Sequence, residues 1–190
     1  ANTSNAPTTA GVYEYWTDFP EGATIASQGT YIIAHGSADS IIASVSDMTY
    51  NYLSNGDDGF ALVYGTEPTI PVDPETGGYT IVDFAGDWNG DPGSGWTVAG
   101  VSNATQNHTL IRKCSVEQGN SDWAASAGTS AEDSEWIVLE INDWSNLGQH
   151  ETPCPDIILG CTDEAASNYN STATEDDGSC EYLGCTDETA

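Results

Sequence analysis

The chain has 190 residues, of which 30 are Asp or Glu and two are Lys or Arg, so its net charge at pH 7 is −28. A surface of this charge repels nucleic acid and anionic lipid, which excludes both as expected partners. No apolar run reaches the length of a membrane-spanning helix, so we also expect no direct membrane insertion.

Short apolar runs, separated by turns rich in Gly, Asn and Asp, follow a small polar segment at residues 1–11. We predict that this first segment is an arm rather than a regular element. The apolar runs are typical of β-strands, which are predicted at 31–34, 60–64, 79–84, 109–112 and 136–141. One stretch predicts a short helix, with Ser37 as its N-cap and an apolar side made of Ile41, Ile42, Val45 and Met48. The sequence therefore predicts a mainly β fold, an antiparallel β-sandwich with one short helix.

The composition changes near residue 153, where Pro153-Cys154-Pro155 predicts a stiff connection. A small unit at 160–183 begins Gly-Cys-Thr-Asp-Glu, and the same five residues begin a second, truncated unit at 184–190. Two units with one opening indicate a repeat. We therefore expect an arm (1–11), a β-sandwich (12–153) and an acidic Cys-rich region (154–190).

Five cysteines in a chain with so few bases indicate an oxidising compartment, hence a secreted, extracellular or cell-surface protein. Cys161 and Cys180 bracket the complete repeat, and a disulfide between them would stabilise it by about 3 kcal/mol. Cys114 and Cys154 form a second candidate pair. Cys185 is then either free or bonded to another subunit, because sequence alone does not fix the connectivity.

Oxygen-bearing side chains gather in the complete repeat, and calcium prefers oxygen ligands. The candidate calcium ligands are Asp163, Asn168, Asn170, Asp176 and Asp177. The alternative is that these side chains bond their own backbone in Asx turns. The run Asp87–Asp91 carries similar donors, and there the Asx-turn interpretation is favoured.

Two further patterns concern sugars. Asn-x-Ser/Thr sequons predict surface glycosylation sites, if the source organism glycosylates, at Asn2, Asn103, Asn107 and Asn170. Five tryptophans are candidates for a sugar-stacking platform, although strand aromatics more often fill a sandwich core: Trp88, Trp96, Trp123, Trp136 and Trp144.

No catalytic grouping emerges from the sequence. His35, His108 and His150 lie far apart and lack metal-ligand spacing. Walker loops, dinucleotide fingerprints and His-Glu-x-x-His helices are all missing from the sequence, so we predict no enzyme activity. The two bases, Arg112 and Lys113, are expected to form ion pairs with the abundant acids.

Several phrases, taken together, resemble a known family: Tyr31–Asp39, Ser54–Leu62, Gly86–Gly93 with Trp96, His108–Lys113 and Asp133–Trp136. Through them residues 12–150 resemble a secreted, bacterial-type lamin-tail domain. The resemblance implies an immunoglobulin-like β-sandwich and a non-catalytic module, of the kind attached to secreted nucleases, lipoproteins or nuclear filament proteins. Residues 160–190 resemble the short acidic Cys repeats at the C-termini of surface proteins from aquatic bacteria.

One departure from the family pattern shapes the functional hypothesis. Lamin-tail domains usually open with a strand that has no counterpart here, so we expect an unpaired sheet edge. That edge would be filled by a segment preceding this sequence or by a strand from another subunit.

Three functional hypotheses follow. The first is a secreted structural subunit of an extracellular fibre or surface layer, whose partners are copies of itself joined head-to-tail, with residues 1–11 or the tail from Cys154 as donor. The second is an accessory module of a larger secreted hydrolase or nuclease. The third is a calcium-dependent adhesin that binds glycans.

Overall fold

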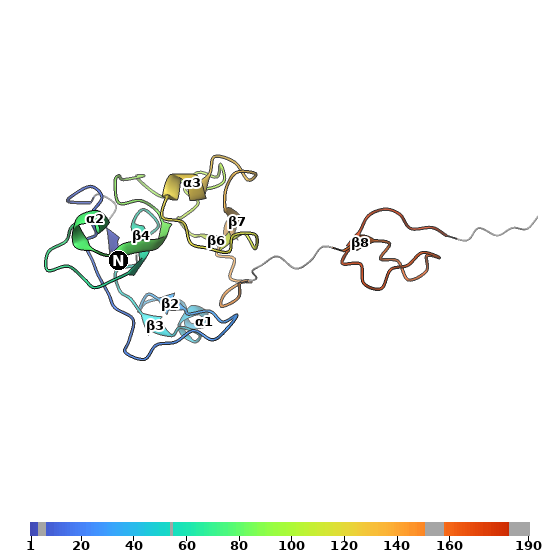
Figure 1. The fold of residues 1–190 in the computed structure, drawn as a ribbon, viewed down its shortest axis with the longest axis horizontal. Coiled ribbons are helices and arrows are strands. Elements are labelled where there is room, and N and C mark those ends of the chain that lie inside the picture. The colour runs from blue at the N-terminus through green and yellow to red at the C-terminus, as the bar shows by residue number, and fades with distance from the viewer. Residues whose placement is uncertain (4–6, 54, 151–157, 183–190) are drawn as a thin grey trace, which may run out of the picture. The chain divides into compact units, whose positions relative to one another are not determined.

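The computed structural model of the chain describes residues 1–3, 7–53, 55–150 and 158–182. It divides into two compact units, Ala1–Pro153 and Cys154–Ala190, which we call the body and the tail unit. Within the described residues, short strands predominate over a few short helices, and the mainly β prediction is confirmed (Figure 1). No helix in this part of the chain is long and apolar enough to cross a membrane.

The elements are short throughout both units. The strands are β1 (Asn2–Thr3), β2 (Ile33–Ala34), β3 (Met48–Thr49), β4 (Gly59–Tyr64), β5 (Thr80–Ala85), β6 (His108–Arg112), β7 (Trp136–Ile141), β8 (Leu159–Gly160) and β9 (Glu175–Asp176). The helices are α1 (Ser40–Ala43), α2 (Pro74–Gly77) and α3 (Trp123–Ala127). Strands β4 to β7 thus confirm four of the strands predicted from the sequence.

The body contains a three-stranded antiparallel sheet in the order β1-β4-β5 and an antiparallel pair β6-β7. Two further pairs, β2-β3 in the body and β8-β9 in the tail unit, are parallel and depart from the antiparallel expectation. In the first of these, α1 lies between the two strands in sequence, and such a crossover brings the second strand back in the same direction.

The prediction that residues 1–11 form an arm was wrong for the first residues. Asn2 pairs with Phe60 and Thr3 with Gly59, and both Asn2 and Thr3 are buried. The Asn2 amide donates to the Tyr52 carbonyl oxygen, and its Oδ1 accepts a hydrogen bond from the Tyr50 hydroxyl. These bonds satisfy the Asn2 side chain, which explains how this polar residue can be buried in the sheet.

The helix prediction was correct in place but wrong in extent and cap. α1 spans four residues, and its N-cap is Asp39, whose carboxylate accepts from the Ile41 N–H at 2.9 Å. Asp47 accepts from the Ile32 N–H at 2.8 Å, which ties the chain after α1 back to β2. Met48 therefore lies in β3 rather than on a helix, and α2 and α3 are further short helices that the sequence reading missed.

Aromatic side chains dominate the core of the body. The buried cluster consists of Tyr13, Ala61, Tyr79, Phe84, Trp88, Val98, Ala104, Trp123 and Ala127. The Trp88 indole donates to the Gly59 carbonyl oxygen at 3.0 Å, and a Cβ added at Gly59 would lie 2.3 Å from the Asp87 carbonyl oxygen. Glycine is therefore required where β4 begins, because any other side chain would displace the chain that carries Trp88.

The burial of the tryptophan side chains shows whether they belong to the core or to a sugar-stacking platform. Trp88 and Trp123 are buried, and Trp96 and Trp136 pack against the same cluster. Trp144 is the exposed member of the five. The five rings thus do not form one surface platform, and the core interpretation is confirmed for the first four.

Candidate functional site

An apolar cleft lies in the body beside β4, and we call it the β4 cleft. Its volume is about 660 Å³. Residues of β4 and β5 line one part of it, and the segment 16–19 and residues of β2 and β3 line another. The other lining residues are Ala1, Tyr50, Leu53, Gly65 and Thr66. The apolar residues on these elements include Trp16, Phe19, Ile33, Met48, Phe60 and Leu62.

Strand β4 pairs with β1 on one side and with β5 on the other. Ala1 and Ala61 exchange two hydrogen bonds, at 3.0 and 2.8 Å. Antiparallel strands exchange such pairs at every second residue, so Val63 is the next position whose N–H and C=O face this side. β5 pairs with Val63 on the opposite side, through Ile81. Within the described residues, β1 and β5 are the strands that pair with β4.

The side chains near the end of β4 are exposed apolar groups. Leu62 is 47% and Tyr64 is 79% exposed, although both belong to a strand. Both residues also line the cleft, so the cleft offers an apolar surface on which a partner group of the same character can be buried.

The cleft carries little net charge for a protein this acidic. Asp18 and Asp83 are the acidic side chains among its lining residues. Arg112 Nη2 lies 2.7 Å from Asp83 Oδ1 and offsets that charge. Burial raises the pKa of the Tyr50 phenol, another lining group, to about 12, so this hydroxyl stays protonated and neutral. An uncharged apolar segment fits such a surface best.

The ion pair predicted for Arg112 is confirmed. Its Nη1 binds Glu135 Oε2 at 2.7 Å, and its guanidinium lies 4.0 Å from the centre of the Trp136 ring. Together with the bond to Asp83, these contacts join β5, β6 and β7. Lys113 instead donates to the Ala131 carbonyl oxygen at 2.7 Å. The arrangement supports the fold behind the cleft.

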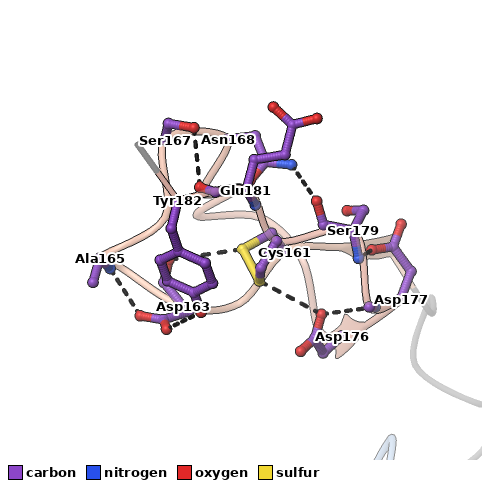
Figure 2. Close-up of a disulfide and its surroundings, with 12 residues drawn as sticks. Cys161, Asp163, Ala165, Ser167, Asn168, Asp176, Asp177, Ser179, Glu181 and Tyr182 are labelled. Carbon is purple, nitrogen blue, oxygen red and sulfur yellow. Dashed lines mark hydrogen bonds between the residues drawn. A yellow bond between two sulfur atoms is a disulfide. The ribbon is translucent and has the colours of Figure 1, made fainter. Parts of the chain in front are cut away.

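The tail unit is organised around the disulfide between Cys161 and Cys180, whose Cα atoms are 4.8 Å apart (Figure 2). The predicted pair is therefore present. Cys161 is fully buried although the unit around it is small. Hydrogen bonds between side chains and backbone surround the bridge, as the dashed lines of Figure 2 show.

The five candidate calcium ligands all use their oxygens in this hydrogen-bond network. Asp163 accepts from the Ala165 N–H and the Tyr182 hydroxyl, and these bonds lower the pKa of its carboxyl. The other four residues each accept a hydrogen bond from a backbone N–H group. Asn168 accepts from residue 181, Asn170 from residue 172, Asp176 from residue 178 and Asp177 from residue 179.

Asp163, Asn170, Asp176 and Asp177 each accept from the N–H two residues further on, as the Asx-turn alternative expects, whereas Asn168 accepts from the more distant Glu181 N–H. Within the described residues, no group of three or more His, Cys, Asp or Glu side chains lies close enough together to hold a metal ion. The calcium site stays a prediction of the sequence.

The remaining cysteines are only partly described. Cys114 is disulfide-bonded. Its predicted partner Cys154 lies outside the described residues, and so does Cys185. The pairing of Cys114 with Cys154 and the intermolecular role of Cys185 stay predictions.

The asparagines of the four sequons differ in their exposure to solvent. Asn103 and Asn107 are exposed, and each has a positive φ, of 56° and 66°. Asn170 is half-buried and accepts hydrogen bonds from Thr172. Asn2 is buried in β1, so its prediction as a surface glycosylation site was wrong for the folded chain.

His35 and His108 each form a hydrogen bond with a backbone group. His35 Nδ1 accepts from the Ser37 N–H at 3.0 Å, and His108 Nδ1 donates to the Leu139 carbonyl oxygen at 2.8 Å. Neither ring is positioned by a carboxylate in these contacts, as a general base usually is.

The structure comprises a mainly β body with an apolar cleft beside β4, followed by a disulfide-stapled acidic tail unit. No protein-family model matches the chain, and neither the curated proteins nor the solved structures provide a significant match. The resemblances to lamin-tail domains and acidic Cys repeats therefore rest on the sequence motifs themselves.

The cleft was not located from the sequence. Its lining residues Met48 and Tyr50 lie at and just after a segment that was predicted as helix, and Phe19 lies outside every predicted element. The available signal was the alternation of β4, which places the apolar residues Leu62 and Tyr64 on the same face of the strand.

Proposed function

We propose that the chain is a secreted, non-catalytic structural subunit of an extracellular fibre or surface assembly. Copies join head-to-tail, through exchange of a strand or of the tail, and disulfides strengthen the joints. The observation that carries this proposal is the β4 cleft, an apolar surface that is open to a partner. Heterologous contacts of this type propagate into chains of subunits.

Other features of the molecule support the same proposal. Disulfide bonds in both units fit an oxidising environment. The lamin-tail resemblance, which we include in the proposal, implies a binding or scaffolding module. Exposed Asn103 and Asn107 would carry glycans if the source organism modifies them.

The proposal is tested on the purified 190-residue chain by light scattering over a series of concentrations, by electron microscopy, and by gel electrophoresis with and without reductant. We expect species larger than one copy whose fraction rises with concentration, and elongated particles in the images. A single monomeric species at every concentration, under both redox conditions, would contradict the proposed function.

A further inference from the structure

We propose that Asn89 is a site of spontaneous chemical modification, at which the side-chain amide becomes a carboxylate without the help of an enzyme. The sequence contains two Asn-Gly dipeptides, Asn55-Gly56 and Asn89-Gly90. The fold leaves the second dipeptide free to react and holds the first in place. This modification is independent of the proposed assembly.

The reaction is an intramolecular substitution at the Asn89 side chain. Hydroxide removes the proton of the Gly90 backbone nitrogen, and this nitrogen attacks Cγ of Asn89. The Cγ–Nδ2 bond breaks, and Nδ2 takes a proton from water and leaves as ammonia, so the chain now contains a five-membered cyclic imide. Water then adds to one of the two imide carbonyls and the adjacent C–N bond breaks, which gives aspartate or isoaspartate. Glycine favours the ring closure because no Cβ obstructs the attacking nitrogen.

The surroundings of Asn89-Gly90 permit this ring closure. Asn89 is exposed, and both residues lie outside the helices and strands. Within the described residues, a Cβ built at Gly90 would meet no atom within 4 Å. Because no neighbouring group packs closely against Gly90, the peptide unit between the two residues can rotate until the nitrogen reaches Cγ.

The hydrogen bonds of Asn89 restrain it only weakly. Asp87 Oδ1 accepts from the backbone N–H and from the side-chain amide of Asn89, each at 2.9 Å. Both bonds are exposed, so water replaces the carboxylate at small net cost. When they open, the amide can turn toward Gly90.

The first dipeptide is held by close packing. A Cβ built at Gly56 would lie 2.4 Å from the Thr105 carbonyl oxygen and 2.8 Å from Gln106 Cα. The Thr105 hydroxyl also donates to the Gly56 carbonyl oxygen at 2.5 Å. Rotation of the backbone at Gly56 would break these contacts, because closely packed groups have no room to move. Asn55 should therefore react slowly, although it is as exposed to solvent as Asn89 is.

The modification would alter the chain next to a core residue. The Asn89 amide donates to Asp87, whereas a carboxylate in its place would repel that acid. An isoaspartate would also lengthen the backbone by one methylene directly after Trp88, whose carbonyl oxygen accepts from the Gly11 N–H at 2.8 Å. Each converted chain gains one negative charge.

The test compares the two dipeptides within one protein. The folded 190-residue chain is incubated at mildly alkaline pH and then digested with pepsin at acidic pH, where little further imide forms. Mass spectrometry of the peptides quantifies the conversion of each asparagine. We expect Asn89 to convert about tenfold faster than Asn55 or more, with aspartate and isoaspartate peptides that separate by chromatography. Equal conversion of the two residues in the folded protein would overturn the proposal.

The same incubation in concentrated urea is the matched control. Unfolding removes the contacts of Gly56, so the two dipeptides should then convert at similar rates. An Asn89 that reacts in urea but stays intact in the folded protein would also overturn the proposal.

The variant G90A tests the route through the imide. A methyl group at this position meets no neighbour, and the φ of Gly90 lies outside the left-handed region, so the fold should be retained and circular dichroism checks it. The added Cβ should slow conversion of Asn89 by about tenfold or more. N89D supplies the aspartate product, and aged wild-type protein should contain a more anionic species that elutes with it in anion exchange. Unchanged conversion in folded G90A, or the absence of that species, would contradict the inference.

Discussion

The body and the tail unit are both acidic but are stabilised in different ways. The body has an aromatic core, in which the Trp88 ring packs edge-on against Phe84 with their centroids 5.2 Å apart. In the described part of the tail unit, the buried apolar residues are Cys161 and Ala166. A unit with so little core depends on its disulfide and its turns, because burial alone cannot offset the loss of chain entropy.

This difference makes the two units separately measurable. All six tryptophans lie in the body, so tryptophan fluorescence reports on the body alone. Amide exchange at Asn170, whose N–H donates to the Cys161 carbonyl oxygen at 2.9 Å, reports on the tail unit. Mutations can therefore be assigned to one unit while the other serves as an internal reference.

The largest effect is expected from W88A in the body. The change removes a buried ring and leaves the Gly59 carbonyl oxygen without its indole donor, so the free energy of unfolding should fall by about 3–5 kcal/mol. Urea unfolding followed by fluorescence measures it, and Asn170 exchange should not change. W144A, at an exposed position, is the control and should shift stability by less than about 1 kcal/mol. Equal losses in the two variants would contradict the aromatic-core account.

The next effect is expected from the double change C161S/C180S in the tail unit. Opening the loop should cost the unit about 3 kcal/mol, which exceeds what its small core can supply. We expect the Asn170 amide to exchange as in an unfolded chain, while the fluorescence transition of the body keeps its midpoint. Retained protection at Asn170 would show that the turns alone hold the unit.

The same contrast explains what the sequence could predict. The Cys161–Cys180 bridge and strands such as β7 follow from local spacing and alternation, and they were found. Strand β1 depends on burial beside β4, more than fifty residues away, and Asn2 looks like a surface residue until Tyr50 and Tyr52 surround it. The strand propensity of a short segment does not indicate which distant residues it will pack against.

The candidate site was hidden for a related reason. The β4 cleft arises where six stretches of the chain meet, and no single segment carries its signature. Ile158 and Leu159 are easier to recognise in the sequence, since they are large apolar residues in a polar region. The exposure of these residues could be learned only from the pairing of β8 with β9.

A smaller effect is expected from R112K in the body. Lysine is a single charged point and cannot hold Asp83 and Glu135 at once or stack on Trp136 as guanidinium does. Losing one charge-assisted hydrogen bond should lower the free energy of unfolding by about 2 kcal/mol. K113A, beside it, should change stability by about 0.5 kcal/mol or less, because its bond to Ala131 is exposed. Urea unfolding of both variants checks the difference, and an R112K variant as stable as K113A would contradict it.

The smallest effect concerns two exposed carboxylates, one in each unit. The Tyr182 hydroxyl, 2.5 Å from Asp163 Oδ2, is the main cause of the lowered pKa of Asp163 in the tail unit. In the body, bonds from Thr129 and Ser130 lower the pKa of Asp133 to about 2. Y182F should raise the pKa of Asp163 toward its ordinary value of 3.8 and leave that of Asp133 unchanged, as carboxyl resonances followed through a pH titration would show.

The direction in which stability changes with pH follows from these pKa values. A carboxylate whose pKa is lowered by folding stabilises the native state above the unfolded value, and that contribution is lost as pH falls through the folded value. For Asp133 the loss extends from about 3.8 down to about 2. In the Y182F variant the tail unit should therefore lose less stability on acidification than the wild type does, while the body responds identically in both. An unchanged Asp163 titration would mean that the Ala165 amide alone sets its pKa, and that the hydroxyl contributes little to holding the stapled loop.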